Sequence, residues 1–515
     1  MESSNRWLWV LLAFGTLACG DHDDRYRQST KPSGPYVVGE AVAYMDRVFS
    51  EVVVIVPEAG ERNVRWHRSS VSEGASVLTV LSERRQLLLK DDDEAVLTSI
   101  SPLEGVSWEA ALNGPYDRFS VNEEAGVLAL FYSANAAGTD LNPYVNQAEI
   151  SFVDLDSGAV RRMVIPTYGG APQGVEITPK LDVGGEPRTL AFVRWKSFLS
   201  VVDLSRGDSV PIKVPLKAQD STATVLPNAL SFWSEGTTLK VFFLAAGTID
   251  LYQLDIDLVQ LGEGGKGVQL NLFPTAAGAA SFSLVELPGD GLRVMVLCQV
   301  ARTVAMVDPA SSTVQQYTLS IVPRTAQVFD MLNVETEIVE KMALILDHSG
   351  GATTYYLAQL EHLATKKSKA FRAFTLPSPL TSVVMLPGGE RFLALHQGGQ
   401  DSMSQVTLAD GSIISVGGTM SVLDRRFSAD RSNLFVLGLR SGVRYLTRLD
   451  TATFAARTLA LPPEFAGSKM ALNEEERLTL LYDNDGEVLV FGSMDFDKEE
   501  DLVVLVGPSL FGLEH

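Results

Sequence analysis

Residues 149–167, EISFVDLDSGAVRRMVIPT, predict a β-hairpin. The first half, residues 150–155, is dense in β-branched, aliphatic and aromatic residues that suit a pleated sheet. The turn at 156–158, DSG, combines an aspartate that can bond nearby backbone with a glycine that tolerates positive φ. The return strand occupies residues 160–165, and Pro166 ends it. Both strands are apolar on both faces, which indicates a sheet packed between other sheets.

The same hairpin pattern recurs along the chain. It is found at residues 198–216 (FLSVVDLSRGDSVPIKVPL), 304–321 (VAMVDPASSTVQQYTLSI) and, more loosely, 443–461 (VRYLTRLDTATFAARTLAL). In each copy the first strand ends near an aspartate and the turn consists of small polar residues. A repeat of this kind indicates a solenoid or a propeller.

The sequence around each hairpin predicts two further strands, so that each unit contains four. About ten units of roughly 45–50 residues can be counted, which is close to known propeller periods. We therefore predict an all-β chain, a β-propeller of four-stranded antiparallel blades from residue 35 to residue 515. The blade number stays open between about seven and ten, in one ring or two, because neighbouring units could merge. No stable helix is expected after residue 35, since residues 361–369 fit a loop as well as a helix.

The composition is that of a globular protein with an acidic surface. Hydrophobic residues make up 46% of the chain, charged residues 20%, and the formal net charge is −21. Such a surface repels phosphate backbones, so we expect no nucleic-acid partner.

The N-terminus carries a targeting signal. Arg6 precedes an apolar run, residues 7–18, which is too short to span a bilayer but suits a signal-peptide core. The run ends in TLACG at residues 16–20, and the chain then becomes polar. This pattern resembles a bacterial lipoprotein signal, although Thr16 stands where that family usually has leucine. Ordinary secretion and a membrane-anchored N-terminus are the alternatives.

The lipoprotein resemblance implies a division of the chain and a location. Residues 1–18 would be the signal peptide, Cys19 the lipidated first residue, and residues 19–34 a flexible tether. Gly20, rather than an aspartate, follows the cysteine, which by the same resemblance favours the outer membrane, facing the periplasm or the cell surface.

The repeat units themselves also resemble a known family. Strand–Asp–turn–strand units with the turns LPGDG (287–291), LPGGE (386–390) and FSADRS (427–432) are similar to bacterial YVTN/WD40-like β-propellers. The resemblance covers nearly all of the chain after the signal, without a WD dipeptide.

No catalytic or cofactor motif is present. The six histidines have no zinc spacing, and neither a GxSxG elbow nor a nucleophilic cysteine context occurs. We therefore expect no cofactor, and a non-enzymatic protein that binds or scaffolds an envelope protein or glycan on its propeller loops.

An enzymatic alternative rests on four polar residues of the predicted opening strands: Glu176, Asn228, Asp330 and Asp424. In propellers these strands line the central channel, and propeller lactonases bind a channel metal with such residue types. The resemblance thus implies a lactonase-like hydrolase as the second hypothesis. The competing interpretation is that polar residues line any wet channel. The two differ in whether the four side chains converge on one centre.

Overall fold

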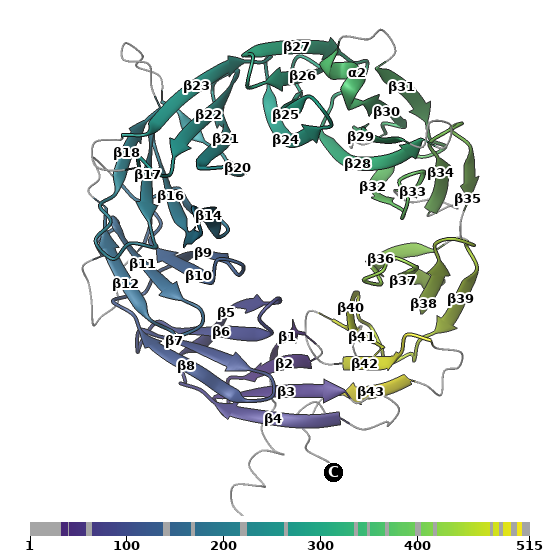
Figure 1. Ribbon diagram of the computed structural model, residues 1–515. Helices are drawn as coiled ribbons and strands as arrows, with labels where there is room; N and C mark the ends of the chain where they lie inside the picture. The colour runs from purple at the N-terminus through teal and green to yellow at the C-terminus, as the bar shows by residue number, and fades with distance from the viewer. Residues whose placement is uncertain are drawn as a thin grey trace, which may run out of the picture.

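The computed structural model describes most of the chain: residues 32–39, 41–57, 64–136, 145–165, 170–216, 224–261, 266–333, 338–347, 351–365, 370–396, 403–415, 420–473, 477–483, 488–495 and 502–506. These residues form ten antiparallel blade sheets, arranged as one closed ring around an open centre, and one further two-stranded sheet (Figure 1). The predicted signal peptide and Cys19 lie outside the described residues.

Each blade is built from strands that are consecutive in the sequence. Blades 1 to 3 contain β1 (Pro32–Val38), β2 (Ala41–Asp46), β3 (Glu51–Pro57) and β4 (Val64–Ser70); β5 (Ala75–Leu81), β6 (Gln86–Asp91), β7 (Val96–Ser101) and β8 (Gly105–Ala111); and β9 (Arg118–Asn122), β10 (Val127–Phe131), β11 (Glu149–Asp154) and β12 (Val160–Val164). Blade 4 contains β13 (Gly174–Ile177), β16 (Leu190–Trp195), β17 (Phe198–Asp203) and β18 (Ile212–Pro215), with an inserted hairpin of β14 (Leu181–Val183) and β15 (Glu186–Arg188). In blade 5 the inner strand is broken into β19 (Leu226–Pro227) and β20 (Ser231–Glu235), followed by β21 (Thr238–Ala246), β22 (Asp250–Asp257) and β23 (Val268–Pro274).

The second half of the ring repeats the same topology. Blades 6 and 7 contain β24 (Ala279–Leu287), β25 (Gly291–Cys298), β26 (Thr303–Asp308) and β27 (Thr313–Thr318); and β28 (Thr325–Asn333), β29 (Ile338–Leu346), β30 (Thr354–Gln359) and β31 (Phe371–Thr375). Blades 8 to 10 contain β32 (Leu380–Met385), β33 (Arg391–His396), β34 (Met403–Thr407) and β35 (Ile413–Ser415); β36 (Ser421–Phe427), β37 (Asn433–Arg440), β38 (Val443–Asp450) and β39 (Ala456–Ala460); and β40 (Lys469–Asn473), β41 (Leu478–Tyr482), β42 (Val488–Ser493) and β43 (Leu502–Val506).

The predicted fold class is confirmed, and the open blade number is resolved as ten in a single ring. The hairpin predicted at residues 149–167 is β11–β12, in which Ile150 pairs with Met163. Within the described residues the only helix is α2 (Leu360–Ala364), a single short turn where residues 361–369 fitted a loop equally well. No helix in this part of the chain is long and apolar enough to cross a bilayer.

The hydrophobic core is divided among the boundaries between blades. One cluster, for example, joins Phe152 of blade 3 to Trp195 of blade 4. The ring closes in the same way, since Tyr44 and Ile55 of blade 1 pack with Leu480 and Phe491 of blade 10. No strand is shared between these two blades, so the ring is held closed at this boundary by apolar packing.

The turn glycine has the left-handed conformation that the sequence predicted, but the aspartate that bonds the turn backbone is Asp154, at the end of the strand, and not Asp156. Asp154 Oδ1 accepts hydrogen bonds from the backbone N–H groups of Asp156 (3.2 Å) and Ser157 (2.8 Å). The fifth residue of the turn, Gly158, has a left-handed φ of 71°. Its N–H donates to the Asp154 carbonyl at 2.8 Å, which completes the turn.

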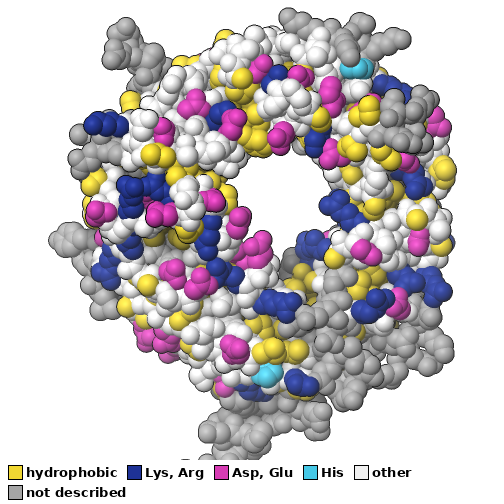
Figure 2. Space-filling view, viewed as in Figure 1, with side chains coloured by type: hydrophobic (Ala, Val, Ile, Leu, Met, Phe, Trp, Pro, Cys, Tyr) yellow, Lys and Arg dark blue, Asp and Glu magenta, His cyan; other side chains and the backbone are white. Residues whose placement is uncertain are grey.

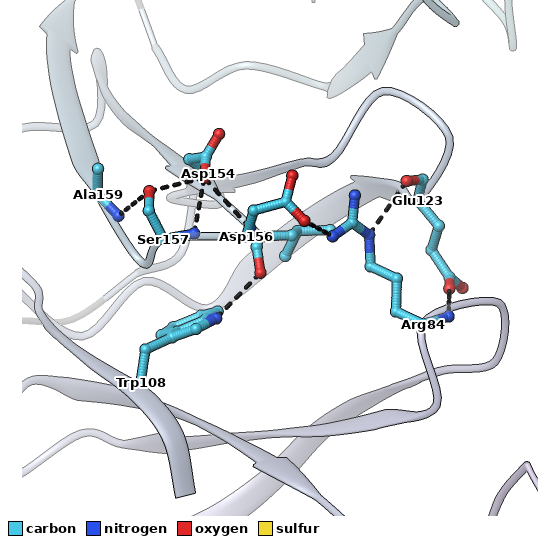
Figure 3. A network of polar contacts seen from close by, with 8 residues as sticks. Arg84, Trp108, Glu123, Asp154, Asp156, Ser157 and Ala159 are labelled. Atoms are coloured by element: carbon cyan, nitrogen blue, oxygen red, sulfur yellow. Dashed lines mark hydrogen bonds and ion pairs between the residues drawn. The ribbon is translucent and has the colours of Figure 1, made fainter.

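Polar contacts also join neighbouring blades (Figure 3). Arg84 of blade 2 donates from Nε to the Glu123 carbonyl of blade 3 at 3.2 Å and forms an ion pair with Asp156. From β8, Trp108 Nε1 donates to the Leu155 carbonyl at 3.0 Å. These contacts join side chains of blade 2 to two turns of blade 3.

Candidate functional site

The central channel holds the polar residues that the sequence singled out. Glu176 lies on β13, Asp330 on β28 and Asp424 on β36, and Asn228 follows β19 directly. Each lies on, or directly after, the first strand of its blade, which is an edge strand of its sheet, and Figure 1 shows two of these strands, β28 and β36, beside the central opening. They come from four different blades (4, 7, 9 and 5), around an opening that stays clear in the space-filling view (Figure 2).

Glu176 is held by a cation of its own blade. Arg194 on β16 forms an ion pair with the carboxylate at 2.7 Å and also donates to the Pro227 carbonyl of blade 5 at 2.9 Å. Burial raises the pKa of the Glu176 carboxyl above its usual range, and the Arg194 charge partly opposes that shift. The pair therefore tethers blade 4 to blade 5.

The other two carboxylates are also engaged locally, whereas the amide residue is exposed. Asp330 pairs with Lys341, its direct cross-strand neighbour on β29, at 2.7 Å. Asp424 accepts a hydrogen bond from the backbone N–H of Met470 in blade 10 at 2.8 Å. Asn228 is exposed at the break between β19 and β20.

These placements bear on the metal hypothesis. The described residues contain no group of three or more His, Cys, Asp or Glu side chains that could hold a metal ion. The four residues come from four different blades, and the three carboxylates are each held by a different partner, so they do not fit a single ligand set for the metal that the lactonase resemblance implies.

A second feature of the inner rim is the β28–β29 hairpin, whose strands are each nine residues long. Near its far end, three large apolar side chains are exposed: Leu332 by 46%, Ile338 by 60% and Val339 by 51%. Leu332 and Val339 are paired across the two strands. Exposed apolar side chains that cluster in this way are typical of protein contact sites.

A groove of about 390 Å³ continues this apolar surface toward blade 8. Phe329, Met385 and Pro387 line it together with Leu332 and Val339. The turn beyond β32 approaches β28 closely, because a Cβ on Gly389 would lie 2.1 Å from the Asp330 carbonyl oxygen. Only glycine therefore allows the two blades to meet at this point.

The sequence analysis placed the favoured binding function on the propeller loops and the enzymatic alternative in the channel residues, and neither prediction named the hairpin end. Leu332 and Val339 lie among charged residues, in MLNVETEIVEK, and this pattern resembles an ordinary solvated hairpin.

Comparisons with known proteins identify no family. No family model matches the sequence, and no curated protein matches it either. Similar solved structures include the dihydro-haem d1 dehydrogenase NirN (11% identity, 73% of each chain, TM-score 0.42) and the Dos1 propeller (12% identity, 74% of this chain and 93% of the other, TM-score 0.40). A putative 6-phosphogluconolactonase from Bacteroides fragilis is also similar (11% identity, 80% and 94% coverage, TM-score 0.31). Likenesses this weak carry no argument about activity.

Proposed function

We propose that this chain is a non-enzymatic binding protein of the cell envelope that presents its propeller to a protein partner. The observation that carries the proposal is the apolar end of the β28–β29 hairpin, formed by Leu332, Ile338 and Val339 beside the groove between blades 7 and 8. Burying these side chains in an interface would remove apolar area from water and stabilise a complex. Apolar contacts favour a protein surface over a glycan, which would require more hydrogen-bonding groups.

The proposal includes the envelope location. Lipidation at Cys19 would anchor the chain, and the tether would place the ring outside the cytoplasm, at the periplasmic or outer face of the outer membrane. The competing lactonase-like hydrolase is supported less well, because Glu176, Asp330 and Asp424 are each fixed by a different neighbour.

A crosslinking experiment tests the proposal. A double variant, Leu332→Lys with Val339→Lys, should lose a protein that the wild-type chain captures in intact cells by crosslinking and mass spectrometry. Val300→Lys is the matched control, since Val300 is 77% exposed on blade 6 and should retain the partner. Equal capture by the double variant and the control would contradict the proposed surface.

The hydrolase alternative is checked in parallel. Purified protein is assayed for lactone hydrolysis with added Ca²⁺, Mg²⁺, Mn²⁺ or Zn²⁺. Activity that is abolished by both Glu176→Gln and Asp424→Asn would replace the binding proposal with a channel enzyme.

A further inference from the structure

The β28–β29 hairpin projects beyond the rest of its blade. In several blades the second strand begins opposite the last residue of the third strand, as Val127 does opposite Asp154 in blade 3. In blade 7 the last residue of β30, Gln359, pairs with Met342, whereas β29 begins four residues earlier, at Ile338. At about 3.3 Å per residue, the hairpin therefore extends about 13 Å past the third strand.

The base of this projection is supported by the helix α2. The helix follows β30 directly, where several other blades have their aspartate turn. The Lys341 backbone N–H donates to Glu361 Oε1 of the helix at 3.0 Å, and Lys341 Nζ pairs with Asp330 across the hairpin at 2.7 Å. The residues beyond Lys341 therefore stand on a fixed base, which lowers the entropy cost of binding through them.

The projecting end, residues 332–340, is called the ridge below. Its exposed apolar side chains are those of Leu332, Ile338 and Val339. The connection between its strands, VETE at residues 334–337, lies outside the described residues and adds the carboxyl groups of Glu335 and Glu337 to the sequence of the ridge. The ridge therefore combines apolar side chains with acidic residues in one short segment.

The groove beside the ridge carries the opposite charge. Its apolar walls include Phe329, Met385 and Pro387, and its volume is about 390 Å³. Arg431, in the first turn of blade 9, also lines it and is exposed. Among the described residues the Arg431 guanidinium has neither an ion pair nor a hydrogen bond. The acid of the lining, Asp330, is already paired with Lys341, so the groove presents one free positive charge.

The ridge and the groove are complementary surfaces of the same chain. Burial of apolar area and pairing of a carboxylate with a guanidinium both favour a contact between them. Within one chain they lie side by side, since Leu332 and Val339 form part of the groove wall. In a twofold-symmetric interface each copy offers the same patch, so the ridge of one copy can meet the groove of the other twice.

We propose that the partner of the ridge is a second copy of this chain, with the ridge of each copy in the groove of the other. The inference rests on the function proposed above, because it names the protein that the same surface binds. The net charge of −21 on each chain opposes association at long range, so we expect a weak dimer with a dissociation constant on the order of 10 µM.

Sedimentation velocity of the purified full-length protein in detergent micelles tests the dimer. Between about 1 and 100 µM chain, the wild-type protein should change from monomer to dimer by mass action. A protein that stays monomeric throughout this range would overturn the inference.

Arg431→Glu should weaken the dimer by at least about tenfold, because it brings like charges together at the contact. Arg302→Glu is the matched control and should dimerise like the wild type. Arg302 is likewise an exposed arginine with a left-handed φ, 51° against 56° for Arg431, and its guanidinium has no ion pair with another described residue. It lies in the turn between β25 and β26, at the opposite end of the strands and therefore on the opposite face of the ring.

Both substitutions change the net charge equally, so a difference between them reports the local contact. A dimer that Arg431→Glu leaves intact would form through another surface and would overturn the inference.

An exchange of charges tests the pairing itself. The double variant Glu335→Arg with Glu337→Arg reverses the charge of the ridge and should also dimerise less than the wild type. Mixed with the Arg431→Glu chain, it should form a heterodimer, because both ridge–groove contacts of the mixed pair then join opposite charges. Failure of the mixture to dimerise more than either variant alone would contradict the proposed pairing.

The failure of this inference is distinguishable from failure of the proposed function. If the wild-type chain is monomeric but the crosslinking experiment captures a different protein that Leu332→Lys with Val339→Lys loses, only the self-association is wrong. If the inference holds, the protein captured in cells should be the chain itself, and the same double variant should be monomeric in sedimentation.

Discussion

Trp108 of blade 2 lies directly against Gly158 of blade 3, so that a Cβ at this glycine would be 2.8 Å from the indole ring. The same indole donates its N–H to the Leu155 carbonyl at 3.0 Å (Figure 3). One turn therefore combines a left-handed φ with a close contact between blades, and both require glycine.

Gly158→Ala is expected to destabilise the protein for both reasons. The left-handed φ alone costs about 1–3 kcal/mol for a residue with a side chain, and the indole must also shift. Gly442→Ala is the control, since Gly442 has φ 81° and nothing within 4 Å of its added Cβ. Chemical denaturation should show a larger loss for Gly158→Ala than for Gly442→Ala, and equal losses would contradict a role for the Trp108 contact.

Phe491→Ala should weaken the closure of the ring. Phe491 is 2% exposed in the cluster that joins blade 10 to blade 1, and truncating a buried phenylalanine costs about 3–5 kcal/mol. Hydrogen exchange should rise first in β2, β3, β41 and β42, because apolar packing holds this boundary closed. Phe435→Ala, in the cluster between blades 9 and 10, is the comparison. The same exchange pattern in both variants would argue against a distinct closure.

Acid should destabilise the turns through their aspartates. Hydrogen bonds from the Ser428 hydroxyl and from Ser432 lower the pKa of Asp430 to about 2. At Asp450, the Thr453 backbone N–H and hydroxyl likewise hold the pKa of the carboxyl below its usual range. A carboxyl whose pKa is lowered by folding stabilises the protein at pH values above its pKa in the unfolded chain, which is about 3.9. This stabilisation is lost as the pH falls toward the pKa of the folded state.

Thermal melts should therefore show the stability falling from about pH 4 toward pH 2. Asp430→Asn should be less stable than the wild type at pH 6 and show a shallower decline. Glu176 has the opposite effect. Because burial raises the pKa of its carboxyl, the contribution of Glu176 to the stability of the protein decreases as the pH rises. An Asp430→Asn variant with the wild-type acid profile would exclude this turn as a source of the acid sensitivity.

Cys19→Ala tests the predicted anchor. If Cys19 is lipidated, the wild-type chain should fractionate with membranes and carry a diacylglycerol by mass spectrometry, whereas the variant should lose the lipid. Equal membrane association of the variant, together with an unmodified wild-type cysteine, would contradict the lipoprotein prediction.

Local chemistry made the fold predictable from the sequence alone. The run from Ile150 to Leu155 and the turn after it specify a hairpin through residues that are neighbours in the chain. The same chemistry recurs at Asp308 and Asp450, so the four-stranded unit and the propeller could be inferred. The number of blades could not be inferred from the sequence. The end of each unit depends on which strands pair, and the segments that connect the strands vary in length.

The candidate sites were decided by the tertiary structure. Glu176 and Asp424 lie on the first strands of their blades, yet which groups hold them depends on Arg194 and Met470, and Met470 belongs to the next blade. Contacts between blades join residues far apart in the chain, such as Arg194 and Pro227 or Arg161 and Leu204, and no local periodicity encodes them. The sequence therefore determined the repeating sheet through turn chemistry and strand composition, whereas packing between sheets determined which side chains meet in the channel and at the hairpin end.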